Sequence, residues 1–449
     1  MLNKMKPWWL TCLGLLASPA AFAVDLVGVH DLALKNDPRL QAAEYRREAA
    51  GETKTQAWSN LLPTIGLGGS MTRGGTNTSI AGVEVSDADV DNESYGVDLR
   101  QSLYRQANYE QLDIARGTIS QADAIYGVAF QDFLVRVADR YFIVLTLTDG
   151  VIFAEAEEKA FQRQFEQAEQ RFEVGLTAVT DVHEARASYD NARARAIVAR
   201  NNLEDAKEAL RELTGEYFEE YDKLKEVLPL VEPEPANPED WVDLTLANSP
   251  VVKSAQASVE IADSNVRLQR AGHFPTLDLV ASYNDFTNNK FIIRNDFQQP
   301  IGTTELGVED TQVALQLNIP IYQGGFVSSR TRQAGYLLDA TTEDLDDTQR
   351  SAVRQTQNAY RGVIGSIQEV EAFGQALISA QSALEATQAG FEVGTRTIVD
   401  VLIAEQRYYQ AQRDNSIARH AYIVNHLRLK AVAGLLTSQD LATVNQLLE

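Results

Sequence analysis

The chain has 449 residues, of which 44% are hydrophobic and 23% charged, a composition typical of folded proteins and not of disordered ones. Its 63 acidic residues outnumber its 40 basic residues, and the resulting formal charge of −23 argues against binding to nucleic acid through phosphate neutralisation. One Cys, three Met and five scattered His argue against soft-metal and His-rich sites, so we expect no metal and no cofactor.

Residues 1–23 have the form of an export signal peptide. Lys4 and Lys6 make a short basic region, the apolar run 8–17 is too short to span a bilayer, and 21–23 is a small-x-small cleavage site. Cleavage there leaves 426 residues with a formal charge of −25, because both lysines are removed. The alternative is an uncleaved anchor. No later run of about 18 apolar residues occurs, so no further membrane-spanning helix is expected.

The mature chain is predicted to begin with a helical segment, Leu26–Ser59, whose only breakers are Pro38 and Gly51. Two strands follow, at about 64–73 and 94–103, where apolar and polar residues alternate with a period of two. Each strand has about 10 residues, close to the ~9–11 that a tilted strand needs to cross a bilayer. The acidic connection between the strands, residues 74–93, is predicted to be an exposed loop, with a disordered insertion as the alternative.

A long helix is predicted next, from about Arg105 to Phe172, where no Pro occurs. Apolar residues recur in it at spacings of three and four, the pattern of a coiled-coil seam. The seam consists of Leu112, Ala115, Ile119, Ala122, Tyr126, Ala129 and Phe133. At ~1.5 Å per residue this helix is on the order of 100 Å long, and a returning helix, Val179–Leu213, is about half that length.

The second part of the chain repeats the first. Residues 38–70 correspond to 250–282, and the string RFEVG at 171–175 recurs as GFEVG at 390–394. Several such anchors in the same order and at nearly constant offset indicate an internal duplication. The two copies meet at a proline-rich linker near 228–238.

The predicted domains are therefore residues 24–232, the first structural repeat, and 233–449, the second. In the second repeat the strands are expected at about 276–284 and 311–321, separated by a polar loop, 284–310. The helices of the second repeat are expected at about 323–390 and 398–434.

Four strands per chain are too few to close a barrel, and an open sheet cannot lie in lipid because its edge N–H and C=O groups stay unpaired. Either the strands form a soluble sheet, or several chains pool them, and three chains would supply twelve. The half-length helices, stacked end to end, would match the long ones, which suggests a hollow rod of paired helices.

The turns between long and returning helices, near 174–181 and 393–400, are the candidate working end. Gly175 and Gly394 each end a long helix, where glycine adopts a positive φ at little cost. If three chains meet at this tip, three carboxylates of Asp400 ring the axis, and a negative ring in a constriction attracts cations.

Simpler roles are open for the charged residues of the second turn. Thr397 and Asp400 have the spacing of a capping box, so Asp400 could serve only as a helix cap. Arg396 could bridge to Thr180 or Asp181 on the neighbouring copy and hold the tips together, or it could be a solvated cation at a helix end.

The order of elements, the duplication and two strings, VGLTAVTDV at 174–182 and VGTRTIVDV at 393–401, closely resemble the TolC family of outer-membrane efflux and secretion channels. The segments 62–64, 274–279 and 319–325 resemble it too, so the resemblance covers essentially the whole mature chain. It implies an α+β membrane protein, an outer-membrane β-barrel with four strands per chain and twelve per trimer. This barrel would be continuous with a long periplasmic α-helical coiled-coil barrel.

The resemblance also implies a function. A homotrimeric channel-tunnel, in contact with lipid in the outer membrane of a Gram-negative bacterium and extending into the periplasm, would give passive exit to drugs and secreted proteins, as in multidrug resistance and type I secretion. Inner-membrane transporters of the RND, MFS or ABC type would deliver them through a periplasmic adaptor, or membrane fusion, protein. No enzyme activity is expected. The alternative is an exported coiled-coil adaptor or adhesin without a pore.

Within this resemblance, Asp400 matches the family's entrance carboxylate. Arg396 matches the basic partner of the closing link, and Thr180 and Asp181 match its acceptors. A mixed belt near the middle of the helical barrel would come from residues 214–245 and the C-terminal residues.

Two residues depart from the family pattern. Phe391 stands where the family has an aromatic hydroxyl, so it cannot hydrogen-bond Asp181. Ile403 stands where the family has a second entrance Asp. A trimer would therefore carry one ring of three carboxylates, and we expect a looser lock and weaker cation block than in a double ring.

Overall fold

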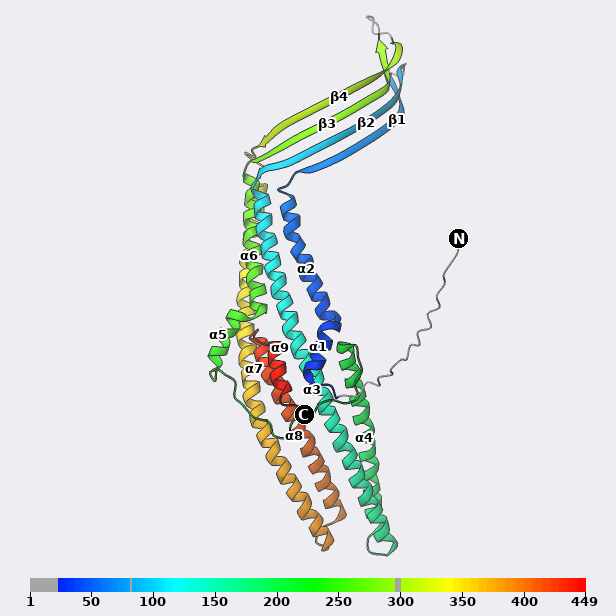
Figure 1. Ribbon diagram of the computed structural model, residues 1–449, viewed down its shortest axis with the longest axis vertical. Coiled ribbons are helices and arrows are strands. Elements are labelled where there is room, and N and C mark those ends of the chain that lie inside the picture. Colours follow the sequence, from blue (N-terminus) through cyan, green and yellow to red (C-terminus); the bar gives the residue numbers. More distant parts are fainter. Residues whose placement is uncertain (1–22, 81–82, 295–299) are drawn as a thin grey trace, which may run out of the picture. The chain divides into compact units, whose positions relative to one another are not determined.

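The structure is a computed structural model that describes residues 23–80, 83–294 and 300–449 (Figure 1). The predicted signal peptide, residues 1–23, lies outside the described residues except for Ala23. The chain forms two compact units. The sheet unit consists of Ala42–Ala129 and Val242–Gln355; the helical unit consists of the chain up to Gln41, Phe130–Trp241 and Thr356–Glu449.

The sheet unit contains one antiparallel sheet in the order β1–β2–β3–β4 (Figure 1). The strands are β1 (Thr64–Ile80), β2 (Val83–Arg105), β3 (Thr276–Arg294) and β4 (Pro300–Asn318). The four predicted strands are confirmed, but each is longer than predicted, with 17, 23, 19 and 19 residues. β4 ends before 321 because Pro320 has no N–H to donate to a neighbouring strand.

The prediction of exposed loops at 74–93 and 284–310 was wrong for most of both segments. The β1–β2 ladder continues through pairs such as Gly75 with Asp89, and the β3–β4 ladder continues through pairs such as Thr287 with Gly307. Backbone pairing needs no apolar side chains, so an antiparallel ladder extends beyond the stretch in which hydrophobic and polar residues alternate.

One face of the sheet is apolar, as the alternation predicted. The register places Leu67 opposite Val97 and Leu279 opposite Leu315, and cross-strand partners lie on the same face. Much of this face is uncovered in the single chain: 84% of Leu67 and 67% of Leu315 is exposed. The apolar face comprises Ile65, Leu67, Met71, Tyr95, Val97, Leu99, Leu277, Leu279, Ala281, Tyr283, Val313, Leu315 and Leu317.

The opposite face of the sheet is polar. Its buried Asp278 accepts hydrogen bonds through Oδ2 from Nη2 of Arg100, at 3.0 Å, and from Nη2 of Arg105, at 2.9 Å. Two guanidinium groups therefore converge on one carboxylate where β2 and β3 adjoin the helices.

The helix predicted at Leu26–Ser59 is two helices, α1 (Leu26–Asn36) and α2 (Pro38–Ser59). Asp37 between them has extended backbone angles, φ −69° and ψ 111°, because the ring of Pro38 disfavours the helical conformation in the residue before it. Pro38 thus ends α1 at a point where the composition alone predicts that the helix continues.

Two helices are exceptionally long: α3 (Gln106–Glu173) has 68 residues and α7 (Phe326–Glu392) has 67. Their returning partners are α4 (Val179–Thr214) and α8 (Ile398–Val432). All four predicted helices are confirmed to within three residues at either end. The hollow rod of paired helices stays a prediction.

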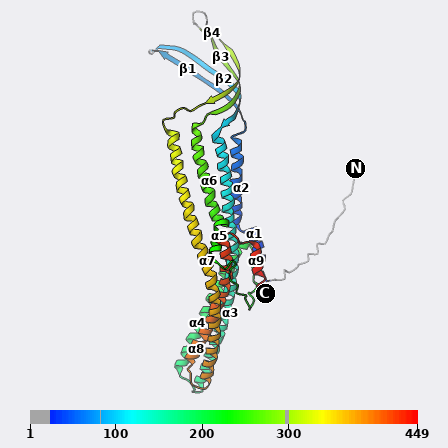
Figure 2. The same cartoon turned by 90° about the vertical axis from the view of Figure 1, so that its left-hand side faces the viewer.

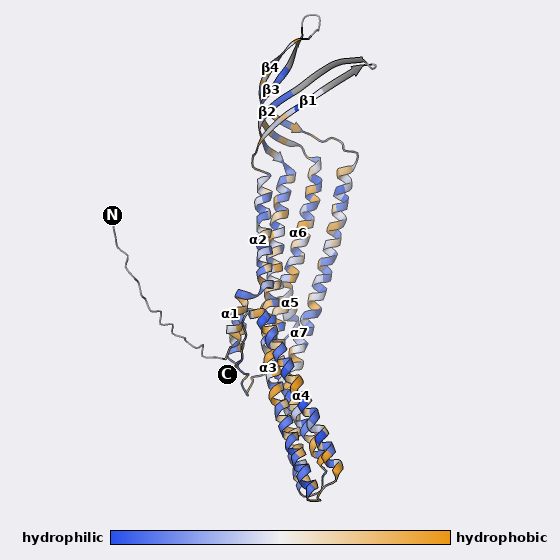
Figure 3. Cartoon of the chain, turned by 90° about the vertical axis from the view of Figure 1, so that its right-hand side faces the viewer, coloured by the Kyte–Doolittle hydropathy of each residue, from blue (hydrophilic) through white to orange (hydrophobic). Residues whose placement is uncertain are grey.

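Within the sheet unit, the first part of α3 contacts both α2 and α6 (Pro250–Arg270). A small apolar cluster joins Ala57 of α2 to Leu112 and Ala115 of the predicted seam. Ion pairs flank this cluster, from Arg47 to Asp123 at 2.7 Å and from Arg267 to Glu110 at 2.9 Å. Figure 3 shows hydrophilic and hydrophobic residues interleaved along α2, α6 and α7. Among helices of the described ranges, none combines the length and apolarity needed to cross a membrane.

The helical unit has its core where α3 passes α1, α8 and the short C-terminal helix α9 (Ser438–Asn445). The hydroxyl of the buried Tyr141 donates to the carbonyls of Val24, at 3.2 Å, and Asp222, at 2.9 Å. Leu224 forms a β-bridge with Leu448. The structure thus brings together the two segments expected to supply the belt, and α5 (Pro238–Asn248) begins within the first of them.

Candidate functional site: the two hairpin tips

Both hairpins of the helical unit, α3–α4 and α7–α8, turn at the same end of the unit (Figure 1, Figure 2). Gly175 and Gly394 take φ values of +75° and +80°. In each turn the glycine N–H donates to the carbonyl three residues back and the next N–H donates to the carbonyl five back, at 2.9 and 2.8 Å in the first and 3.1 and 2.8 Å in the second. This is the Schellman motif, so both glycines end their helices as predicted.

Asp400 forms the capping box that the sequence spacing indicated. Its Oδ2 accepts from the backbone N–H and the hydroxyl of Thr397, both at 2.9 Å, and its own N–H donates to the Thr397 hydroxyl at 3.3 Å. The Thr397 donors, followed by the charge of Arg396, lower the pKa of Asp400, so its carboxylate is ionised at neutral pH. Oδ1 of Asp400 accepts no hydrogen bond within the described chain, so capping leaves one charged oxygen available.

The closing link is not formed inside a single chain. Asp181, in the first turn of α4, accepts a hydrogen bond from the hydroxyl of Thr177. Across the described residues, no ion pair or hydrogen bond joins Arg396 to Thr180 or Asp181. Arg396 is exposed and lies against Gly390, where a Cβ would stand 2.8 Å from its Cγ. Gly390 therefore leaves room for the arginine stem, a role that the sequence did not reveal.

Phe391 has a partner that no sequence pattern predicted. The guanidinium carbon of Arg171, at the end of α3, lies 4.5 Å from the centre of the Phe391 ring, a cation–π contact. The ring also packs against the apolar cluster that holds the hairpins together. A phenylalanine at this position therefore still links the two hairpins, through its π face and without a hydroxyl.

The apolar cluster below the tips draws on α3, α4 and α8. Its buried members are Phe161, Ala168, Ala185, Ala192, Ile398 and Leu402. Half of these are alanine, whose small side chain lets the helices approach closely. The cluster fixes α3–α4 against the start of α8, so the two tips form one site in the helical unit.

A series of polar pairs follows the contact between α3 and α8, and we call it the α3–α8 ladder. It comprises Thr146 with His420 at 2.9 Å, Asp149 with Ser416 at 2.5 Å, Glu157 with Arg413 at 3.2 Å, and Gln164 with Glu405 at 3.2 Å. Their α3 members recur at spacings of three, eight and seven, close to multiples of a helical turn, so they occupy one face. This face is polar where a coiled coil is usually apolar, and the hydrophobic pattern could not reveal it.

Glu157 is the most buried member of the ladder, with 0% of the residue exposed. Its Oε1 accepts from Nη2 of Arg195 on α4, at 2.8 Å, and its Oε2 from Nη1 of Arg413 on α8, at 3.2 Å. Both carboxylate oxygens are paired with cations, so this one side chain joins three helices and both repeats.

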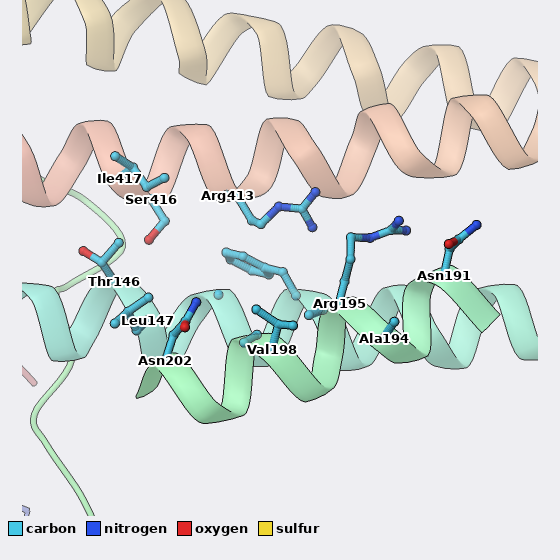
Figure 4. A pocket seen from close by; sticks show the side chains of 14 residues that line it. Thr146, Leu147, Asn191, Ala194, Arg195, Val198, Asn202, Arg413, Ser416 and Ile417 are labelled. Carbon is cyan, nitrogen blue, oxygen red and sulfur yellow. The ribbon is translucent and has the colours of Figure 1, made fainter. Parts of the chain in front are cut away.

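A cavity of about 510 Å³ lies beside this ion-pair group, between α3, α4 and α8 (Figure 4). Figure 4 shows Arg195 and Val198 projecting from α4, and Arg413 and Ser416 projecting from α8. The helices are therefore incompletely packed at this level, where the ion pair of Glu157 with Arg413 joins the two hairpins.

The comparisons with known proteins agree with this architecture. The sequence profile of a family described as outer membrane efflux protein matches residues 29–216 and again residues 241–435. The chain belongs to this family. The double match accords with the internal duplication, and it favours the channel over the alternative of an adaptor or adhesin without a pore.

Relatives match over nearly their full length. Outer membrane protein TolC of Vibrio cholerae is 36% identical over 99% of this chain and 98% of its own. The alkaline protease secretion protein AprF of Pseudomonas aeruginosa is 30% identical over 99% of this chain and 91% of its own. The crystal structure of the outer membrane protein VceC of Vibrio cholerae has a TM-score of 0.74 and 18% identity, covering 92% of this chain and 97% of that one.

The predicted fold class and location are thereby confirmed: this is an α+β outer-membrane channel protein of the TolC family. The family is one of transport channels and not of enzymes. Its channels are trimers that work with adaptors and inner-membrane transporters.

Proposed function

We propose that three copies of this chain enclose one duct through the outer membrane, and that the hairpin tips form its periplasmic entrance. One observation carries the proposal: the four-stranded sheet has two unpaired edges, β1 and β4, and an uncovered apolar face. Lipid cannot satisfy the backbone groups of an open edge, so the edges must pair with other copies. Three copies supply twelve strands, with the apolar face toward lipid and the Asp278 face inward.

The cargo follows from the relatives. The family description names efflux, and the name of the relative AprF refers to the secretion of a protease. We therefore assign this duct to both kinds of export, drugs and secreted proteins. It would be fed by inner-membrane transporters of the RND, MFS or ABC type through a periplasmic adaptor. The chain itself serves as the passive exit.

At the entrance, three copies of Asp400 would form a single carboxylate ring, each with Oδ1 free to meet a passing cation. Ile403, one turn further along α8, is half exposed and adds no second ring. Arg396 of one hairpin would reach Thr180 and Asp181 of a hairpin in the adjacent copy, because no such link forms within one chain. Cation binding at this entrance should therefore be weaker than at a double ring.

Asp400→Asn tests the proposed function as a whole. Trimers reconstituted in planar bilayers are expected to conduct ions and to prefer cations, and the variant is expected to lose most of that preference because three charges leave the narrowest point. The measurement is the reversal potential in a KCl gradient. Asp190→Asn, on the exposed surface of α4, is the matched control and should keep the wild-type value. Absence of conductance in the wild type would refute the duct itself.

Arg396→Ala is expected to increase single-channel conductance while trimer assembly is unchanged, because the entrance loses a link but the barrel does not. Arg407→Ala removes an exposed arginine of the same helix, more than two turns from the tip, and serves as control. Equal conductance for wild type and Arg396→Ala, measured at the same salt concentration, would count against the link.

A further inference from the structure

The last pair of the α3–α8 ladder before the tips contains a buried carboxyl group that forms no ion pair among the described residues. Glu405, on α8, is 5% exposed. Its Oε1 accepts from the side-chain amide of Gln164 on α3, at 3.2 Å, and from that of Gln388 on α7, at 3.5 Å. One carboxyl group therefore joins both hairpins just below the candidate entrance.

Two atoms of this group are left unsatisfied. Oε2 of Glu405 is buried without a hydrogen-bond partner, and so is Oε1 of Gln164. Both are acceptors when Glu405 is ionised, and two buried acceptors cannot satisfy each other. A proton on Oε2 converts one of them into a donor. The neutral acid and the amide then have the groups for two reciprocal hydrogen bonds, N–H to Oε1 of Glu405 and O–H to Oε1 of Gln164.

Glu157 provides a comparison within the same contact of α3 and α8. Both of its oxygens are paired with arginines, whereas Glu405 is paired only with uncharged amides. Burial of an unpaired charge is costly, so Glu157 is suited to be a carboxylate and Glu405 to be an acid.

The surroundings of Glu405 supply little compensating charge. From α3, Arg163 is exposed and donates to the carbonyl of Lys159, and the carboxylate of Glu157 opposes ionisation of Glu405. α7 contributes the neutral Gln388, and α4 contributes alanines to the adjoining cluster. On α8 itself, Tyr409 stays neutral because burial raises its pKa.

We propose that Glu405 is a neutral acid in the closed entrance, paired with Gln164 through two hydrogen bonds, and that its ionisation loosens the α7–α8 hairpin from α3 and favours opening. In this step the acid O–H bond breaks and the proton passes to water. The inference rests on the proposed function, since it assigns a regulatory role to a residue of that same entrance.

The direction of the pH dependence follows from the burial of Glu405, which raises its pKa above the ordinary glutamate value; the amide donors and Arg163 only partly oppose this. The closed state holds the proton more tightly than an open state in which Glu405 is solvated. The link is complete below the ordinary pKa and is lost as pH rises through the raised pKa. Each unit by which the pKa of Glu405 in the closed state exceeds its pKa in the open state shifts the opening equilibrium by about tenfold per chain.

Two other ionisable groups, Asp400 at the tip and His420 in the ladder, have lowered pKa values. The pKa of Asp400 is lowered by its Thr397 donors, so its ring charges below this range. His420, at the far end of the ladder, has a pKa lowered to about 4 by burial and loses its charge at the acidic end of the range. A rise in conductance with pH that is lost in Glu405→Gln therefore reports on Glu405.

The test compares full-length trimers in planar bilayers between pH 4.5 and 8, a range that begins just above the ordinary glutamate pKa of about 4.3 and brackets a raised one. Wild-type conductance is expected to rise with pH. Glu405→Gln keeps both hydrogen bonds but cannot ionise, so its conductance is expected to stay at the low value. Glu385→Gln removes the same charge from the exposed surface of α7, where Glu385 accepts from Gln381, and should keep the wild-type profile.

The outcomes separate the two proposals. If wild-type trimers conduct no ions, the duct is refuted. If they conduct and Glu405→Gln shows the wild-type pH profile, the duct stands and the acid–amide link is overturned. Infrared difference spectra supply a second readout that does not depend on gating. A band of a protonated carboxyl that is present in the wild type at pH 5 and lost in Glu405→Gln supports the link. Absence of this band from the wild type at pH 5, which is just above the ordinary glutamate pKa of about 4.3, overturns the link.

Discussion

Glu157→Ala is expected to lower the unfolding free energy of the protein by about 3 kcal/mol, because Arg195 and Arg413 lose the carboxylate that neutralises them. The value is at the lower end of the range for a broken buried ion pair, since both arginines are partly exposed and water can solvate them in part. The loss should appear as a lower thermal midpoint of the purified trimer, followed by circular dichroism.

A matched control lies two residues earlier on the same helix. Glu155 pairs with Arg200 at 2.9 Å near the surface, and Glu155→Ala should change stability by less than about 1 kcal/mol. Replacing Glu157, Arg195 and Arg413 together by apolar residues of similar volume should recover much of the loss, because no uncompensated charge remains. Equal midpoints for Glu157→Ala and Glu155→Ala would show that the buried group contributes no more than a surface pair.

Leu315→Arg is expected to prevent assembly in the outer membrane. Leu315 lies within the apolar face of β4, where an arginine at the bilayer midplane costs about 2–4 kcal/mol, and a trimer carries the change three times. The measurement is the amount of heat-resistant trimer in isolated outer membranes.

Gln316→Arg is the control for this prediction, because the next residue of a strand points to the opposite face. It places the same charge at nearly the same depth on the polar side of the sheet, and assembly should continue. Loss of trimers in both variants, or in neither, would contradict the assignment of the apolar face to lipid.

The sequence predicted some parts of this fold well for identifiable reasons. The long helices were located to within a few residues because no Pro interrupts Gln106–Glu173 or Phe326–Glu392 and a glycine ends each. The apolar face of the sheet was predicted because alternation with a period of two requires only local information. Strand length was underestimated, since the ladders continue where the side chains no longer alternate.

The candidate site was predicted only in part. Local signals located both glycine turns and the Thr397–Asp400 capping box, which depend on residues a few positions apart. The ladder and the contact of Arg171 with Phe391 join residues more than 200 positions apart. Such pairs are set by which helix faces meet, and a single sequence carries no record of that.

The repeated glycine turn has a consequence for symmetry. Gly175 and Gly394 give both hairpins of a chain the same backbone ending, so a ring of three chains presents six similar loops. Their side chains differ, with Asp181 held by Thr177 on one loop and Asp400 held by Thr397 beside Arg396 on the next. A protein that recognises only the shape of the loops has six equivalent binding sites, whereas one that recognises their charged side chains has two alternating sets of three sites.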